Sequence, residues 1–143
     1  MTTWLLDVNV VIALVDAAHL HHDEAHDWFA REGRRSWATC PMTENALVRI
    51  VGNPRYPNSP GSPAAVMPML ISLTSRPGHV FWPDDFSIGS HQWVDARSLL
   101  THHQVTDSYL LALARKNGGK LVSFDRRLVT SAVAGGGATL HVI

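Results

Sequence analysis

Four carboxylates occupy positions where a chain of ordinary composition rarely places a charge. Asp7 and Asp125 each follow a short apolar run, and Glu44 and Asp107 each begin an amphipathic helical pattern. Burying an isolated charge costs several kcal/mol unless the charge is paired or binds a metal ion. Four acids at the ends of core elements therefore suggest one shared acidic site, and the simplest reason to build such a site is to hold divalent cations.

Carboxylates that converge repel one another. Two unit charges about 4 Å apart repel by about 4 kcal/mol at an effective dielectric constant of about 20, so protonation or bound cations must relieve the repulsion. Hard oxygen ligands without paired histidines or cysteines favour Mg²⁺ or Mn²⁺ over zinc. One or two such ions can activate water and stabilise an in-line phosphoryl displacement. The predicted reaction class is phosphodiester hydrolysis.

Each acid taken alone has a simpler explanation. Asp7 and Asp125 can cap the helices that follow them, and Glu44 and Asp107 can complement a helix dipole for about 0.3–1 kcal/mol each. An acid that only complements a helix dipole can do so from an exposed position on the helix. Glu44 and Asp107 instead share their helical faces with aliphatic residues three, four and seven positions further on, so those faces turn inward. A shared site explains all four acids better.

Strand patterns alternate with helical patterns along the chain. We predict strands at 4–6, 36–40, 79–82, 120–123 and 139–142, and helices at 22–33, 42–51, 64–74, 93–100, 107–117 and 126–131, with a strand-to-helix turn at 7–9. Thr106 is expected to cap the helix at 107–117. This alternation indicates an α/β fold with a mainly parallel sheet. Sites in such folds form beyond the carboxyl ends of the strands, where Asp7 and Asp125 are expected.

The whole chain fits one domain of 143 residues, and its 45% hydrophobic and 17% charged residues are ordinary for a globular protein. Its formal net charge of zero lacks the overall basic signature of a nucleic-acid binder. The single cysteine, Cys40, excludes an intrachain disulfide and favours a reducing compartment. We find no signal-peptide pattern and no apolar run of about 20 residues, so we expect a cytoplasmic protein without a membrane segment.

The acids also lie within four motifs that resemble a known family. In chain order these motifs are D-V-N-V-V-I-A-L, T-E-N-A-L-V-R-I, V-T-D-S-Y-L-L-A-L-A and L-V-S-F-D-R-R-L. Together they resemble a PIN-domain nuclease, and most closely the VapC-type ribonuclease toxins of bacterial toxin–antitoxin pairs. The resemblance covers nearly the whole chain. The N-P-R after the second motif and the stretch T-H-H-Q-V-T-D are similar to one subset of these toxins.

The resemblance carries expectations about structure and chemistry. It implies one PIN domain over residues 1–143, a three-layer α/β/α sandwich with a five-stranded sheet ordered 3-2-1-4-5, Mg²⁺ or Mn²⁺ as cofactor, and endonucleolytic RNA cleavage. It also implies a homodimer and inhibition by a VapB-type antitoxin. The family's acidic quartet maps onto Asp7, Glu44, Asp107 and Asp125, and its supporting polar positions map onto Asn9, Thr106 and Ser123. Many members carry Ser or Thr where this chain has Asn9, which can still orient Asp7.

Other polar residues are weaker candidates. His22 and His26 have the i, i+4 spacing of a zinc pair, but no clear third ligand accompanies them, so a polar helix face is the favoured interpretation. Arg126 and Arg127 follow Asp125 directly and are predicted to contact RNA phosphates. Tyr56 lies in a proline-rich loop and is a candidate for stacking on an unpaired base.

Three functions compete at this stage. The leading hypothesis is a metal-dependent endoribonuclease toxin that cleaves structured RNA, with tRNA favoured because a neutral protein must choose its substrate by shape rather than by long-range attraction. A phosphatase of the haloacid-dehalogenase type would use Asp7 as nucleophile, but it usually needs a second aspartate where this chain has Asn9. The third possibility is a catalytically silent RNA-binding or partner-binding module.

Overall fold

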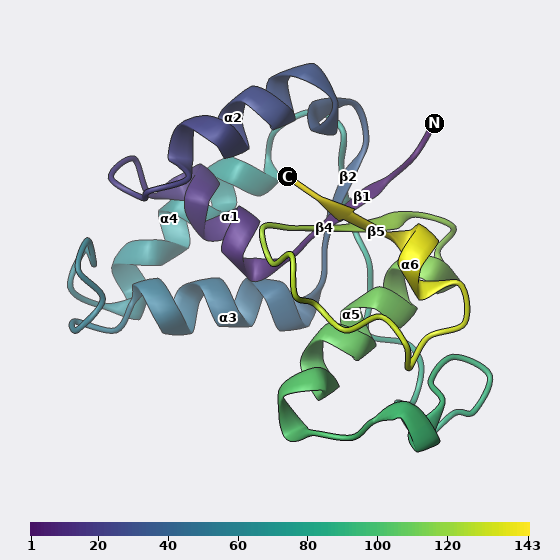
Figure 1. The fold of residues 1–143 in the computed structure, drawn as a ribbon. Helices are drawn as coiled ribbons and strands as arrows, with labels where there is room; N and C mark the ends of the chain where they lie inside the picture. Colours follow the sequence, from purple (N-terminus) through teal and green to yellow (C-terminus); the bar gives the residue numbers. More distant parts are fainter.

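A five-stranded sheet forms the centre of the protein in a computed structural model that describes all 143 residues (Figure 1). Every strand pairing is parallel, and the order is β3-β2-β1-β4-β5. This order confirms the predicted topology and puts β1 and β4 side by side. The strands are β1 (Trp4–Leu6), β2 (Trp37–Thr39), β3 (His79–Phe81), β4 (Lys120–Ser123) and β5 (Leu140–Val142).

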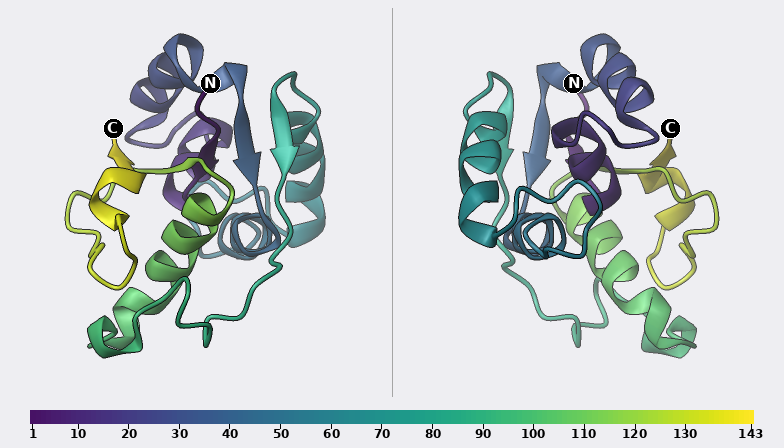
Figure 2. Two further views of the ribbon diagram at one scale, coloured as in Figure 1. Left: turned by 90° about the vertical axis from the view of Figure 1, so that its right-hand side faces the viewer. Right: turned by 90° about the vertical axis from the view of Figure 1, so that its left-hand side faces the viewer.

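Helices cover both faces of this sheet, which gives the expected α/β/α layering (Figure 2). Successive strand residues point to opposite faces, so Leu6 joins one buried cluster and Leu5 the other. The first cluster packs under α1 to α4, and the second under α5 and the loops near it. The helices are α1 (Val8–Val15), α2 (His22–Arg31), α3 (Pro41–Val51), α4 (Pro63–Thr74), α5 (Val105–Lys116) and the single turn α6 (Gly136–Thr139).

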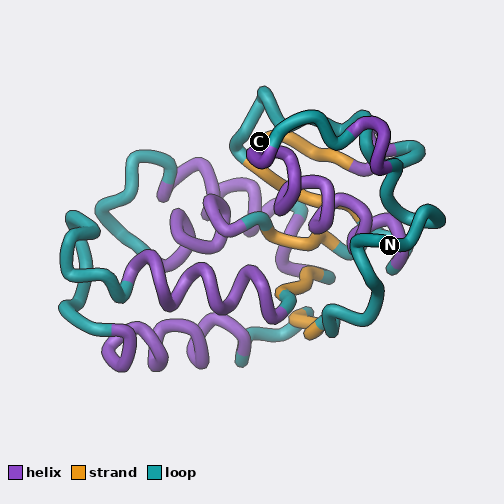
Figure 3. Tube along the Cα trace, turned by 90° about the horizontal axis from the view of Figure 1, so that it is seen from below, coloured by secondary structure: helices purple, strands orange, loops and turns teal.

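The α5 side of the sheet contains more loop than the side of α1 to α4 (Figure 3). The helix predicted at 93–100 is wrong, because only a 3₁₀ turn, Ala96–Ser98, forms there. The buried side chain of Gln104 explains the difference. Its Oε1 accepts from the amides of Leu100 and Thr101, and its Nε2 donates to the carbonyl of Ser98. These backbone groups are therefore satisfied without a helical ladder.

The helix predicted at 126–131 is also wrong, since a turn stands in its place. The Asp125 carboxylate accepts from the amide of Arg127 at 2.9 Å, which closes a local turn. The cap assigned to Thr106 is wrong too. A 3₁₀ helix, His102–Gln104, leads directly into α5, and Thr101 forms a capping box with Gln104. No helix is both long enough and apolar enough to cross a membrane.

Candidate active site

The carboxyl ends of β1 and β4 place Asp7 at the predicted edge of the sheet. Leu6 pairs with Val122, and the amide of Asp7 donates to the carbonyl of Val122 at 2.9 Å. Asp7 then caps α1, since its Oδ1 accepts from the amide of Val8 at 2.8 Å. Only 6% of Asp7 is exposed. One residue therefore ends a strand, starts a helix and holds a buried carboxylate.

The hydroxyl of Ser123 connects the ends of these two strands. It donates to Asp7 Oδ2 at 2.7 Å and accepts from Asn9 Nδ2 and from the amide of Asp125, each at 3.1 Å. Asn9 Oδ1 in turn accepts from the amide of Phe124 at 3.3 Å. Ser123 is completely buried, so these bonds are shielded from water. The supporting positions predicted at Asn9 and Ser123 thus hold Asp7 and the backbone before Asp125.

The buried carboxyl of Asp7 has a pKa raised above its ordinary value. Desolvation is the largest cause, and the charge of Asp125 adds to it, while the hydrogen bonds from Ser123 and Val8 oppose it. A raised pKa means that the ionised form is held at a cost in the folded protein. A bound cation would offset this cost.

Asp107 is the third acid at this edge, in the first turn of α5. Its partly buried carboxyl has a pKa raised to about 6, first by desolvation and then by the charges of Asp7 and Asp125. The side chain therefore interacts electrostatically with both acids of the β1–β4 edge. Three of the four predicted acids consequently share one electrostatic environment, although Asp7 and Asp125 are 118 positions apart in the chain.

Glu44 occupies the first turn of α3 and has a different partner. Its Oε2 accepts a hydrogen bond of 2.6 Å from the hydroxyl of Thr39, the last residue of β2. Sequence analysis missed Thr39, although a polar residue that ends an apolar strand five positions before an acid was an available signal. Glu44 does not contribute to the raised pKa of Asp7 or Asp107. The structure thus groups three aspartates and places the glutamate on α3, where it is hydrogen-bonded to the end of β2, the strand next to β1.

The acidic edge suits a hard cation in its donor chemistry. All the candidate donors are carboxylate oxygens. The pKa values of Asp7 and Asp107 are raised first by burial and then by mutual repulsion, and a divalent cation would favour the ionised form of both groups. No three histidine, cysteine, aspartate or glutamate side chains lie close enough together to enclose an ion. Mg²⁺ usually keeps several of its waters and takes only one or two carboxylates from the protein.

The remaining predicted residues lie at varying distances from this edge. Thr106 is exposed on the first turn of α5, next to Asp107. Arg126 and Arg127 are exposed in the turn after β4, and Arg126 borders a depression that it shares with acids of α2.

Tyr56 lies away from the acidic edge. It donates a hydrogen bond to Asp16, which caps the end of α1 opposite to Asp7. Base stacking by Tyr56 stays a prediction, and its observed contact anchors the proline-rich loop.

The histidine pair of α2 has a structural role. His22 Nδ1 lies 2.7 Å from the carbonyl of Ala13, and His26 Nε2 lies 2.8 Å from that of Leu14. These carbonyls belong to the last turn of α1, where no intrahelical donor is available. The two rings therefore satisfy the end of α1, in line with the favoured interpretation of a polar helix face.

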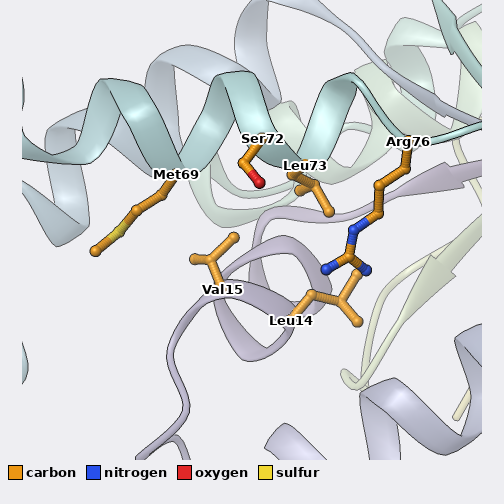
Figure 4. A pocket seen from close by; sticks show the side chains of 6 residues that line it. All are labelled: Leu14, Val15, Met69, Ser72, Leu73 and Arg76. Carbon is orange, nitrogen blue, oxygen red and sulfur yellow. The ribbon is translucent and has the colours of Figure 1, made fainter.

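A depression at this same end of α1 contains no acid. Its volume is about 220 Å³, and it lies between α1 and α4, with the Arg76 side chain reaching across Leu14 (Figure 4). Four of its six lining residues are hydrophobic. It is separated from Asp7 by the length of α1, so it does not belong to the acidic edge. Its lining residues are Leu14, Val15, Met69, Ser72, Leu73 and Arg76.

The PIN domain family model matches residues 4–133, which include all four acids and both supporting strands. The chain belongs to the PIN-domain family. Within it, the chain is 44% identical to ribonuclease VapC39 of Mycobacterium tuberculosis over 133 residues, covering 93% of this chain and 96% of that protein. It is 42% identical to ribonuclease VapC44 of the same species over 131 residues, covering 92% of each. This PIN domain is thus a member of the VapC ribonuclease toxins, which removes the phosphatase alternative.

Solved structures confirm the PIN-like fold. The M. tuberculosis VapC20 structure, described as a Sarcin-Ricin loop cleaving toxin, matches with a TM-score of 0.64 at 18% identity, covering 92% of this chain and 96% of VapC20. VapBC2 of Rickettsia felis, solved with a DNA fragment from its promoter, matches with a TM-score of 0.56 at 11% identity, covering 87% and 89%. At these identities the likeness concerns the fold of the PIN domain.

Removing the Ser123 hydroxyl should destabilise the PIN domain. Ser123→Ala leaves Asp7 Oδ2 without its donor, and it leaves Asn9 Nδ2 and the amide of Asp125 without the Ser123 acceptor. We expect the free energy of unfolding to fall by about 1–3 kcal/mol in urea denaturation, since buried polar groups lose their partners. Ser131→Ala, at an exposed serine, is the matched control and should change little. Equal stability of both variants would show that the hydroxyl does not hold this edge together.

Proposed function

We propose that this PIN domain is a Mg²⁺- or Mn²⁺-dependent endoribonuclease that acts as the toxin of a VapBC-type pair. The observation that supports this most directly is the grouping of Asp7, Asp107 and Asp125 at one sheet edge, with the pKa of Asp107 raised to about 6. These acids and Glu44 are the proposed catalytic and metal-binding residues. When bound, the cation supplies an activated water and neutralises charge that develops on the phosphate.

The chain's own residues have separate tasks in this proposal. Ser123 and the amide of Val8 hold the Asp7 carboxylate in one orientation. Asp107 interacts with the charges of both Asp7 and Asp125, which suits a carboxylate that binds the same cation as they do. Arg126 and Arg127, both exposed in the turn after β4, are the proposed contacts to RNA phosphates. The expected products carry 5′-phosphate and 3′-hydroxyl ends.

The substrate and the partners are further parts of the proposal. We favour structured RNA, with tRNA first, because zero net charge offers little long-range attraction to an extended backbone. A VapB-type antitoxin is the proposed inhibitor, since the relatives are VapC proteins and one structural neighbour comes from a VapBC system. A homodimer, a cytoplasmic location and a single functional unit over residues 1–143 complete the proposal.

Cleavage of total RNA by the purified protein tests the proposed function. We expect discrete cuts in a few structured RNAs with Mg²⁺ or Mn²⁺ and none with excess chelator. Sequencing the new 5′ ends would identify the RNA and the cut site. RNA binding without cleavage at any metal concentration, unaffected by removing the acids, would instead support the catalytically silent module.

A further inference from the structure

Glu44 stands at the end of a chain of two hydrogen bonds that begins outside the acidic edge. The Thr39 hydroxyl lies 2.6 Å from Glu44 Oε2 and 2.7 Å from Nε2 of His79, a residue of the edge strand β3. Thr39 is completely buried, so no solvent competes for its hydroxyl. A hydroxyl carries one proton, and an ionised carboxylate carries none. The Thr39 proton therefore points to Glu44, and His79 must donate its Nε2 proton to Thr39.

We propose that His79 and Thr39 are positioning residues for Glu44, which fix one carboxylate oxygen and leave Oε1 as the oxygen that faces a cation or its water. This inference rests on the proposed function, because it gives the fourth acid of that site its orientation. Both residues act through Glu44 and need not touch RNA. Hydrogen bonds to an ionised group are roughly twice as strong as neutral ones, so this pair can hold the carboxylate in one rotamer.

The sheet holds His79 in the position that this role requires. His79 pairs with Trp37 in the parallel register of β2 and β3, and its ring packs against the Trp37 indole with centroids 4.7 Å apart. Partial burial lowers the pKa of the imidazole below its ordinary value, although the charge of Glu44 opposes this shift. The ring is therefore neutral at pH 7 and carries one proton, which belongs on Nε2. A neutral donor orients Thr39 without adding a positive charge beside the acids.

Two pairs of variants separate positioning from packing. Thr39→Val keeps the shape but loses the donor, whereas Thr39→Ser restores it. His79→Leu loses the donor to Thr39, whereas His79→Gln offers an amide N–H in its place. Mn²⁺ binding to the metal-free protein is measured by the loss of the electron paramagnetic resonance signal of the free ion. This readout is independent of turnover. Thermal unfolding of each variant reports whether the fold is retained.

The donor-deleted variants should bind Mn²⁺ and cleave RNA about 10–100-fold less well, the usual cost of losing a partner behind a metal ligand. Their conservative counterparts should recover most of the loss. In a Glu44→Gln background, Thr39→Val should add less than about a twofold change, because its effect passes through Glu44. Wild-type binding and cleavage by Thr39→Val would overturn the positioning role alone. A wild-type protein that neither binds Mn²⁺ nor cleaves RNA would overturn the proposed function and this role with it.

Discussion

Asp7→Asn is expected to abolish RNA cleavage while leaving the fold as stable as the wild type or more stable. One residue that stabilises charge in the transition state typically contributes a factor of roughly 10²–10³ to the rate. We therefore expect the rate of RNA cleavage to fall by at least that factor. Stability should move the other way. The pKa of Asp7 is raised mainly by burial, so its ionised form destabilises the folded state at neutral pH. An amide of the same shape removes the charge and keeps one acceptor oxygen, which can serve either the amide of Val8 or the hydroxyl of Ser123.

Cleavage rates and melting temperatures measured on the same preparation check this prediction. Asp27→Asn is the matched control, because Asp27 is an exposed acid on α2 away from the acidic edge. It should change neither quantity. Full activity in Asp7→Asn would remove Asp7 from the catalytic set. An inactive variant with a lower melting temperature would show that the hydrogen bonds of Asp7, including its cap of α1, stabilise the fold by more than the buried charge costs.

Asp107 should make the metal-free protein less stable as the pH rises from about 4 to about 6. Its pKa is about 6 in the folded protein against 3.8 as the ordinary value, so the folded state binds more protons between these limits. Stability falls with rising pH wherever the folded state holds the extra proton, and the contribution of Asp107 is therefore lost across this window. Thermal unfolding in metal-free buffer should show the decline, and Asp107→Asn should flatten it.

Mn²⁺ should reverse this decline above about pH 6. A cation that binds the ionised acids competes with the proton on Asp107, so the stabilisation by Mn²⁺ should grow as pH rises through about 6. Melting temperatures with and without Mn²⁺ at pH 5 and pH 7.5 give the comparison. Equal stabilisation at both values, or the same stabilisation in Asp107→Asn, would show that Asp107 does not participate in binding the cation.

Local patterns in the sequence predict the parallel sheet and the edge of the site, whereas the strand order was expected from the resemblance to PIN domains. Asp7 ends an apolar strand, and parallel strands bring their carboxyl ends together, so its neighbourhood with Asp125 is expected. Thr39 and His79 were not predicted as partners of Glu44, because a pairing between strands forty residues apart brings His79 to Thr39. The false helix at 93–100 has a similar cause, since the buried amide of Gln104 decides that segment from outside it.

The Ser123 hydroxyl also ties the proposed active site to the part of the chain that is synthesised last. It joins Asp7 to the last fifth of the chain, so a nascent polypeptide that ends before Lys120 has neither this donor nor Asp125. Pairing of β1 with β4 is a contact of high sequence separation, which forms only after most of the chain is available. We therefore expect fragments from premature termination before β4 to lack a complete form of the proposed active site.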